Sequence, residues 1–496
     1  MKNIKVLFAL LLFAGIFNSC SDAYEIVQPG ELYPIDAIQN VNDMNSALIS
    51  LYDQVYPDDE IAFTSYFTDE TAIGIDNGGQ SLPEYRFNLL ATNSYVRAIW
   101  LNNYNLIVSA NRIIQLSDNV VLDPESASFE DDTIEKNRIL AEVRTLRALG
   151  FIQLEAYFST DMTDDNALGV MLLDHVPSDL PNKEMLPRVE NGLIYAFINE
   201  DLDFAEDNLQ ANSSALVTQQ LVTGLRARLA LYRAKYAEAL TYADEVINQY
   251  PATSQGLASA NSYPSIWDNS SSSEIIFGLE RPSGKPGIAS NWYFNEVSIS
   301  GGAYMEVSRS LYNAYPNNDV RRGVVVLDGS VISPNYSTVF DYRGQDILLP
   351  GKYPGVAQLP LNNRVPVMRT AEIHLIKAEA QVGLGDLDGA LTTLNFLRSR
   401  RISSGSALSA FTTQQDGFAA VLKERRLELA FEGFRYIDLH RLGTLAGVSS
   451  VDRYERDCEP YGACTLSVTD YRFTLPIPQA EINGNNVIAD QQNPGY

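Results

Sequence analysis

The densest group of residues that could do chemistry lies close to residue 430. Glu428, Glu432 and Asp438 place three carboxylates there, together with the guanidinium groups of Arg425 and Arg435. A glycoside hydrolase needs two carboxyl groups that flank one bond, so this group is a natural place to look for one. However, residues three and four apart on a helix face each other, and opposite charges at those spacings pair and stabilise the helix. The spacing therefore favours structural ion pairs over catalysis.

Other catalytic signatures are missing from the sequence. The three histidines, His175, His374 and His440, are too scattered for metal-ligand spacing, so only the fold could bring them together. His374 and His440 are expected to be structural. No GxSxG elbow, phosphate-binding loop or HExxH motif is present. We therefore predict no catalytic residue, no metal site, no cofactor and no enzyme; a secreted glycosidase would need carboxylates that converge only in the fold.

Aromatic residues in polar loops are better candidates for ligand binding. A sugar presents a flat C–H face and a ring of hydroxyl groups, so a capture site needs aromatic faces beside polar side chains. Trp292 and Tyr293, in the loop NWYFN, are the first candidates. Adjacent aromatic residues on a strand point to opposite faces, so at most one or two of them can meet one ligand. Core packing is the alternative for these two residues. Trp267 is a further candidate, and its alternative is to anchor a turn.

The amino terminus predicts secretion and lipidation. Lys2 and Lys5 lead into the continuous apolar run VLFALLLFAGIF, which has the length of a signal peptide and is too short to span a bilayer. The run ends just before Cys20, in a sequence that resembles the lipobox of bacterial lipoproteins. We expect residues 1–19 to be removed and Cys20 to carry lipid. An ordinary signal peptide or a membrane-anchoring first helix is the alternative.

Charge and cysteine content narrow the range of partners. The formal net charge is −26, and loss of the two lysines with the signal peptide makes the mature body more negative. Nucleic acid and anionic membrane surfaces are poor partners for such a field. Strongly sulfated or uronate-rich polymers are also disfavoured, unless a basic patch or bound cation intervenes. Cys458 and Cys464 lie in one short loop without a histidine nearby, so a local disulfide is favoured over a metal site.

Helical periodicity dominates the rest of the chain. Apolar residues recur at i, i+3 and i+4 in three stretches, as in helices that pack on a core. These stretches are residues 91–118, 134–158 and about 190–209. The chain is therefore predicted to be mostly α-helical.

Two further stretches resemble helical hairpins of the tetratricopeptide type. Residues 217–250 indicate two helices broken near Arg233, and residues 370–401 repeat the design around a Gly-Leu-Gly-Asp turn. We expect a helical scaffold over about 40–250 and 368–443. The insertion of about 252–367 is rich in Ser, Asn, Gly, Pro and aromatic residues, with short β-like runs that include Val324–Leu327, and the tail 444–496 is also loop-rich. Binding residues tend to lie on loops held by a scaffold, so the insertion is where we expect the ligand.

The motifs of the carboxy-terminal region carry a family resemblance. Glu424 to Arg441 (ERRLELAFEGFRYIDLHR) is similar to the ER-x-EL-x-FEG-x-R-x-x-DL-R run of the SusD/RagB family, the lipoprotein partners of TonB-dependent transporters in Bacteroidetes. The terminal segments LPIPQAEI and QNPGY are similar to further family motifs. Shorter matches keep their order along nearly the whole chain. The resemblance implies one SusD-like body over residues 20–496, with a tetratricopeptide-like scaffold, a ligand-binding face opposite it, and no catalysis.

The resemblance also implies a second candidate site and a role. Family members often use a tryptophan near the start of one helix with polar residues from the preceding loop. The corresponding residues here are Asp76, Arg86, Trp100 and Asn105, although the helical stripe makes core packing the alternative for Trp100. Acidic residues directly after Cys20 resemble the surface-export signal of Bacteroidetes lipoproteins. We therefore predict a lipoprotein on the outer face of the outer membrane that captures a glycan and delivers it to a SusC-like transporter. A binding lid for peptides or another nutrient is the alternative.

Overall fold

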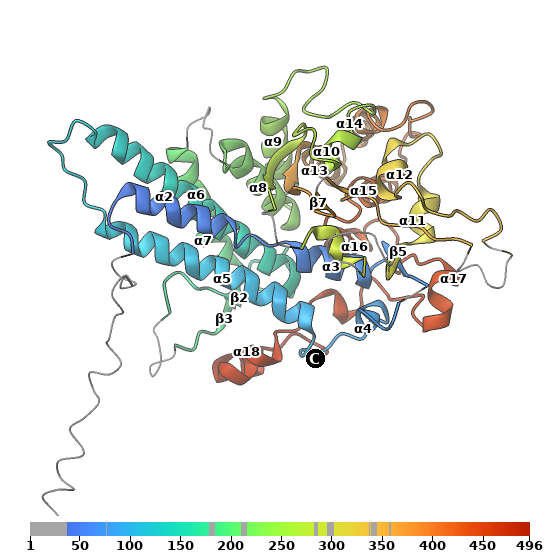
Figure 1. Ribbon diagram of the computed structural model, residues 1–496, viewed down its shortest axis with the longest axis horizontal. Helices are drawn as coiled ribbons and strands as arrows, with labels where there is room; N and C mark the ends of the chain where they lie inside the picture. The colour runs from blue at the N-terminus through green and yellow to red at the C-terminus, as the bar shows by residue number, and fades with distance from the viewer. Residues whose placement is uncertain are drawn as a thin grey trace, which may run out of the picture.

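Long helices form one side of the molecule. The computed structural model describes residues 37–75, 77–177, 184–209, 216–281, 286–294, 302–336, 338, 345–356 and 359–496, so the predicted signal peptide and Cys20 lie outside the described residues. The long helices are α2 (Val41–Tyr52), α5 (Ser94–Leu116), α6 (Phe129–Phe158) and α7 (Asn191–Asn208). They run side by side in the elongated half of Figure 1, with α6 packed against the other three.

Local sequence explains where these helices begin and which face they bury. The Asn93 side chain caps α5 by accepting hydrogen bonds from the backbone N–H groups of Tyr95 and Val96. The predicted apolar stripe of α5 is buried, including Ile99 and Ile107. Asn40 caps α2 in the same way. Capping residues and helical spacing therefore agree with the structure over this part of the chain.

Both predicted hairpins are found as antiparallel helix pairs. The first is α8 (Gln219–Tyr232) with α9 (Tyr236–Ile247), and the second is α13 (Thr370–Gly383) with α14 (Leu387–Ser399). Helix α13 packs against α9, α14 and α15 (Gln414–Glu428). Gly383 permits this contact, because a Cβ atom there would lie 2.3 Å from the Tyr236 ring. The hairpins therefore stack on each other although more than a hundred residues separate them in the chain.

The connecting segments contain short helices and small sheets. The short helices are α3 (Asp58–Phe67), α4 (Leu82–Tyr85), α10 (Pro264–Trp267), α11 (Arg309–Ala314), α12 (Val320–Val325), α16 (Arg435–Leu442), α17 (Glu455–Cys458) and α18 (Gln479–Gly484). The strands are β1 (Thr71–Ile73), β2 (Leu168–Met171), β3 (Arg188–Glu190), β4 (Ile275–Leu279), β5 (Met305–Val307), β6 (Gly355–Val356), β7 (Leu359–Pro360) and β8 (Val365–Arg369). They pair antiparallel as β1–β5, β2–β3, β4–β8 and β6–β7. The mostly α-helical fold class is confirmed.

One β-like run is helical instead. Val324 and Val325 end α12, and only Val326 makes a β-bridge, with Pro350. Asp319 caps this helix, and Arg321 in its first turn is fully buried among carboxylates. Tertiary ion pairs and the cap thus override the β-propensity of the valines.

Two further features concern the apolar character of the helices and the tail of the chain. Over the described part of the chain, no helix has both the length and the apolar character needed to cross a membrane. In the tail, Cys458 and Cys464 form a disulfide at the end of α17. The disulfide closes the short loop in which both cysteines lie.

Candidate functional site

The predicted aromatic platforms are core residues in this structure. Trp292, Tyr293 and Trp100 are each 1% exposed, and Trp267 is 2% exposed. The Trp292 indole donates to Ser65 Oγ at 2.9 Å, and its ring packs on Phe431 at 5.0 Å. None of these four rings offers a face to a ligand, so the expectation of stacking on them needs correction. Trp267, Trp292 and Tyr293 pack together in the core of the insertion, whereas Trp100 packs against Tyr104 and Phe158 among the long helices.

The remaining candidates of the second group do not converge around Trp100. The Trp100 indole points inward and donates to Glu481 Oε2 at 3.3 Å. Arg86 and Asn105 are exposed, and Asp76 lies outside the described residues. Asn105 follows Trp100 by five residues on α5, which places it on a different side of that helix. These residues remain candidates for contact with a ligand, but not as one site built on Trp100.

The structure instead brings the two predicted loops together around an aromatic patch, formed by Tyr95, Phe294 and Tyr304. Phe294, two residues after Trp292 in the NWYFN loop, is 40% exposed, while Tyr95 and Tyr304 are half-buried. The ring centroids of Phe294 and Tyr304 lie 5.5 Å apart at an angle of 58°. Buried Tyr66 joins the patch from below, because its hydroxyl lies 3.2 Å from that of Tyr304 and its ring contacts Tyr95 at 5.7 Å.

Polar groups of the second predicted loop line the same surface. Asn77 Nδ2 donates to the backbone oxygen of Tyr304 at 2.9 Å and to that of Gln80 at 3.1 Å. Asn77 Oδ1 accepts from Gly79 N at 2.7 Å, and Ser81 Oγ lies 3.4 Å from the Tyr95 hydroxyl. Amide and hydroxyl groups thus surround an exposed aromatic face, the combination that recognises sugars.

Two strands hold the patch in place. Strand β5 follows Tyr304 directly and pairs with β1, with Met305 opposite Ile73. Gly74 N then donates to the Tyr304 backbone oxygen at 3.0 Å, and a Cβ atom on Gly74 would lie only 2.5 Å from the oxygen of Ala303. The chain therefore needs glycine at this position to bring the Asn77 loop against Tyr304.

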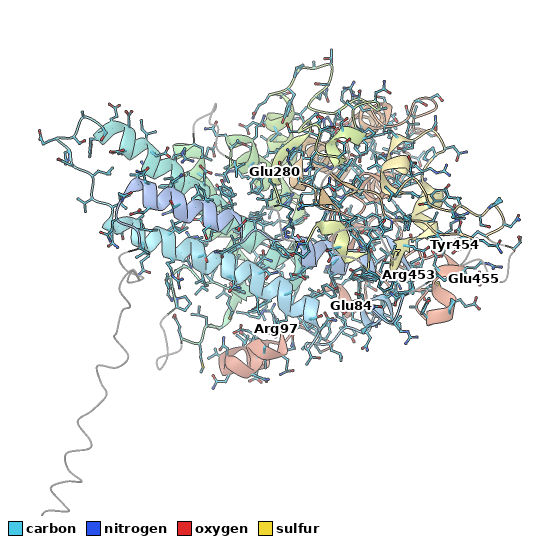
Figure 2. The ribbon with its side chains drawn as sticks, in the orientation of Figure 1. Glu84, Arg97, Glu280, Arg453, Tyr454 and Glu455 are labelled. Atoms are coloured by element: carbon cyan, nitrogen blue, oxygen red, sulfur yellow. A yellow bond between two sulfur atoms is a disulfide. The ribbon has the colours of Figure 1, made fainter. Side chains whose placement is uncertain are left out.

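A buried arginine anchors the base of the patch. Arg453, labelled in Figure 2, donates to five backbone carbonyls, including those of Tyr66, Phe67 and Thr68 at the end of α3. Its guanidinium stacks over Tyr85 at 4.0 Å and Phe87 at 4.2 Å from the ring centroids. Burial lowers its pKa to about 10. The arginine joins the tail of the chain to the helix that carries Tyr66.

The conspicuous carboxylates of the sequence form a buried ion network away from this surface. Glu428 is fully buried and pairs with Arg321, Arg369 and Arg401, and Glu432 pairs with Arg369 and Lys352. These cations hold the pKa of Glu428 well below its usual range, although burial alone would raise it. Both carboxylates are therefore ionised and saturated by cations, as expected for structural ion pairs.

We expect the free energy of unfolding to fall as pH rises from 6.5 to 8. Burial raises the pKa of Glu60, Glu155 and Glu306 to about 8 each, whereas these groups ionise near 4.5 in the unfolded chain. In the folded protein these carboxyl groups keep their protons to a higher pH than in the unfolded chain. Their contribution to stability is therefore complete below the pKa of the unfolded chain and is lost as pH rises through the pKa of the folded protein. Each group contributes a slope of about 1.4 kcal/mol per pH unit. Lys352, whose pKa is lowered to about 8 by burial, opposes this trend increasingly as pH approaches and passes 8.

Denaturant unfolding at pH 6.5, 7.0, 7.5 and 8.0 measures this slope. Glu155→Gln removes one of these groups and should reduce the slope by about a quarter, because Glu70, whose pKa burial raises to about 7, also titrates in this window. Glu155 Oε2 has no hydrogen-bond partner among the described residues. The glutamine amide therefore replaces a carboxyl group that already lacks one hydrogen-bond partner. A stability that rises with pH, or a slope unchanged in Glu155→Gln, would contradict the prediction.

Comparisons with known proteins point to one family. A family model described as the SusD family matches residues 360–496. Two relatives come from Formosa agariphila. SusD-like protein P25 is 23% identical and matches 100% of this chain and 99% of its own length, and SusD-like protein P2 is 25% identical and matches both chains in full.

Solved structures give the same result. A SusD superfamily protein from Bacteroides thetaiotaomicron is 27% identical, with a TM-score of 0.75 over 92% of this chain and 100% of its own. A laminarin-binding SusD-like protein is 22% identical, with a TM-score of 0.67 over 92% of this chain and 100% of its own. The family that the sequence motifs predicted is confirmed by these matches: the SusD family model matches the carboxy-terminal part of the chain, and SusD-like relatives and structures match nearly its whole length.

Proposed function

We propose that this protein captures a glycan on the aromatic patch. The observation that carries the proposal is the exposed face of Phe294 beside Tyr304, with the Asn77 loop at its edge. A flat exposed ring can stack on the C–H face of a sugar, and the neighbouring amides and hydroxyls can bind its hydroxyl groups. The laminarin-binding relative supports a glycan as the ligand.

The proposal is for binding without hydrolysis. Glu428 and Glu432 are held by arginines and Lys352 in the core, away from the patch. A carboxyl group that acts as general acid must reach the bond it cleaves. Incubation of the purified protein with the bound glycan should release no reducing sugar, and measurable release would refute this part of the proposal.

The proposed place of work is the cell surface. Lipid on Cys20 would hold the body at the outer membrane, and a SusC-like TonB-dependent transporter would receive the glycan. This part rests on the lipobox-like sequence before Cys20 and on the family. The high negative charge supports a neutral glycan over a strongly acidic one.

Removal of the Phe294 ring or of the neighbouring Tyr304 ring should weaken glycan binding by about tenfold. An aromatic contact and the surface it buries account for an effect of this size. The measurement is calorimetric titration of the purified protein with laminarin, other neutral polysaccharides, acidic polysaccharides and a peptide mixture. The variants are Phe294→Ala and Tyr304→Ala.

Phe129→Ala provides a matched control for these variants. Phe129 begins α6 and is 37% exposed, close to the 40% of Phe294, but it does not belong to the patch. It should bind glycans as the wild type does. Equal affinity of all three variants would exclude the patch as the site. If the protein binds only peptides, the proposal of a glycan ligand is wrong and the peptide alternative holds.

A further inference from the structure

We propose that Glu306 is a positioning residue for the aromatic patch, and that its ionisation makes glycan capture pH-dependent. The inference deepens the proposed function and rests on it. Glu306 lies on β5, two residues after Tyr304, and is 8% exposed. It does not belong to the patch itself, so it acts through the backbone that it contacts.

Glu306 links the patch to two other segments. Its Oε1 accepts from the backbone N–H of Ile75 at 3.3 Å, and its Oε2 accepts from the backbone N–H of Leu348 at 3.3 Å. Both distances lie beyond the usual range for an N–H···O hydrogen bond, so each bond is weak as it stands. Ile75 is 41% exposed and immediately follows Gly74, which donates to Tyr304. The carboxyl group therefore contacts the loop that carries Asn77 to the patch.

The Glu306 carboxyl faces a cavity that is rich in acidic groups. The charged groups that line it with Glu306 are Asp346, Asp457 and Arg309, and the phenol groups of Tyr336 and Tyr461 complete its titratable lining. Arg309 pairs with Asp346 at 2.9 Å, and its backbone N–H donates to Asp457 Oδ2 at 2.8 Å. The lining thus holds one guanidinium, which pairs with Asp346, against three carboxyl groups, so the cavity carries an excess of negative charge once all three ionise.

This environment keeps Glu306 protonated at neutral pH. Burial, followed by the charges of Asp457 and Asp346, raises the pKa of Glu306 to about 8. The pKa of Asp457 is raised to about 6 by burial, so Asp457 ionises first as pH rises. Glu306 therefore changes charge within one unit of neutral pH.

Ionisation of Glu306 should tighten its hold on the loop. A carboxylate accepts hydrogen bonds from N–H groups that are shorter and about twice as strong as those of a neutral acceptor. The Ile75 and Leu348 amides are already directed at the two oxygens, so neither segment has to rearrange. Because Asn77 Nδ2 and Gly74 N both bond to the Tyr304 backbone oxygen, a firmer hold on Ile75 fixes the polar edge of the patch. Glycan affinity should increase as Glu306 ionises.

Calorimetry with laminarin at pH 6.5 to 9.0 tests this inference. The wild type should bind about fivefold more tightly at pH 9 than at pH 7, with a midpoint near pH 8, as expected for one strengthened hydrogen bond. Glu306→Gln cannot ionise and should show the same affinity across the range. Glu280→Gln is the control, because Glu280 is 65% exposed, pairs with Arg364 and lies well apart from Glu84 and Arg453 in Figure 2. It should retain the wild-type profile.

A wild-type profile without pH dependence, or a Glu306→Gln profile like that of the wild type, would overturn the inference. A second measurement does not depend on any glycan. Hydrogen exchange of the peptide that spans residues 74–81, expressed as protection relative to free peptide at each pH, should show protection increasing through pH 8 in the wild type only. If exchange follows this pattern while laminarin does not bind, the proposed function fails and the positioning role stands; equal protection in both proteins would refute the positioning role.

Discussion

Glu428→Gln should lower the free energy of unfolding by about 3–5 kcal/mol, the range for removing one partner of a buried ion pair. Three arginines converge on this single carboxylate. Arg369 Nη1 donates to its Oε1 at 2.7 Å, Arg321 Nη1 to its Oε2 at 3.0 Å, and Arg401 contacts both oxygens. All four side chains are essentially inaccessible to solvent. Glutamine keeps the shape but leaves these buried cations with less negative charge.

The effect should be large because the three arginines come from separate parts of the chain. Arg321 belongs to α12, Arg369 ends β8, and Arg401 follows α14. Glu428 therefore joins the insertion to the helical scaffold. Denaturant titration measures the change. Glu135→Gln is a matched control, because Glu135 pairs with Arg138 at 2.6 Å but is 43% exposed, and its loss should change stability by less than about 1 kcal/mol.

The same variant distinguishes a structural role of Glu428 from a catalytic role. A catalytic glutamate can usually be replaced by glutamine with activity lost and the fold kept. The ion network predicts the opposite, a loss of stability. If Glu428→Gln unfolds at the wild-type denaturant concentration, the network is not what stabilises this part of the fold.

Arg453→Met should lower the free energy of unfolding by at least as much as Glu428→Gln and should also weaken glycan binding. Methionine keeps much of the apolar stem but leaves five carbonyl groups without their donor, and unsatisfied buried groups each contribute about 1–3 kcal/mol. The distances from Arg453 to these carbonyls are between 2.5 and 3.0 Å. Because three of them belong to Tyr66, Phe67 and Thr68, the support of the patch is lost as well.

Arg453→Lys distinguishes charge from geometry. Lysine keeps the positive charge, but its single ammonium group cannot reach five carbonyls that a planar guanidinium fork serves. It should therefore be clearly destabilising, although less so than methionine. Arg472→Met is the control, since Arg472 is 27% exposed and pairs mainly with its neighbour Asp470. Wild-type stability of Arg453→Lys would show that charge alone is sufficient at this position.

Most of the helical scaffold was predictable because its causes are local. The apolar spacing of α5, the Asn93 cap and the turn between α13 and α14 all act within a few residues of one another. The valines of α12 were wrongly predicted as β-like, because the cause of this helix is not local. Their helix depends on Arg321, whose carboxylate partners Glu424 and Glu428 lie a hundred residues further along the chain.

The candidate site was predictable only in outline. The sequence pointed to the NWYFN loop and to the loop that contains Asp76, and the structure brings Phe294 of the first loop and Asn77 of the second to Tyr304. It did not reveal that Phe294 is exposed while Trp292 is buried, because that depends on Ser65 and Phe431. Tyr95 and Tyr304 carry no local signal that distinguishes them from other tyrosines, and they join the patch through Tyr66.

By itself, the sequence determined the helical class, the family motifs and the structural nature of Glu428 and Glu432, because periodicity and charge spacing act over three or four residues. Only the tertiary structure decided which aromatic faces meet solvent, which cations neutralise Glu428, and that Glu306 contacts the loop at the patch. Burial of a side chain and the pKa of a carboxyl group depend on everything packed around them. Those neighbours come from segments up to several hundred residues away, which no local pattern records.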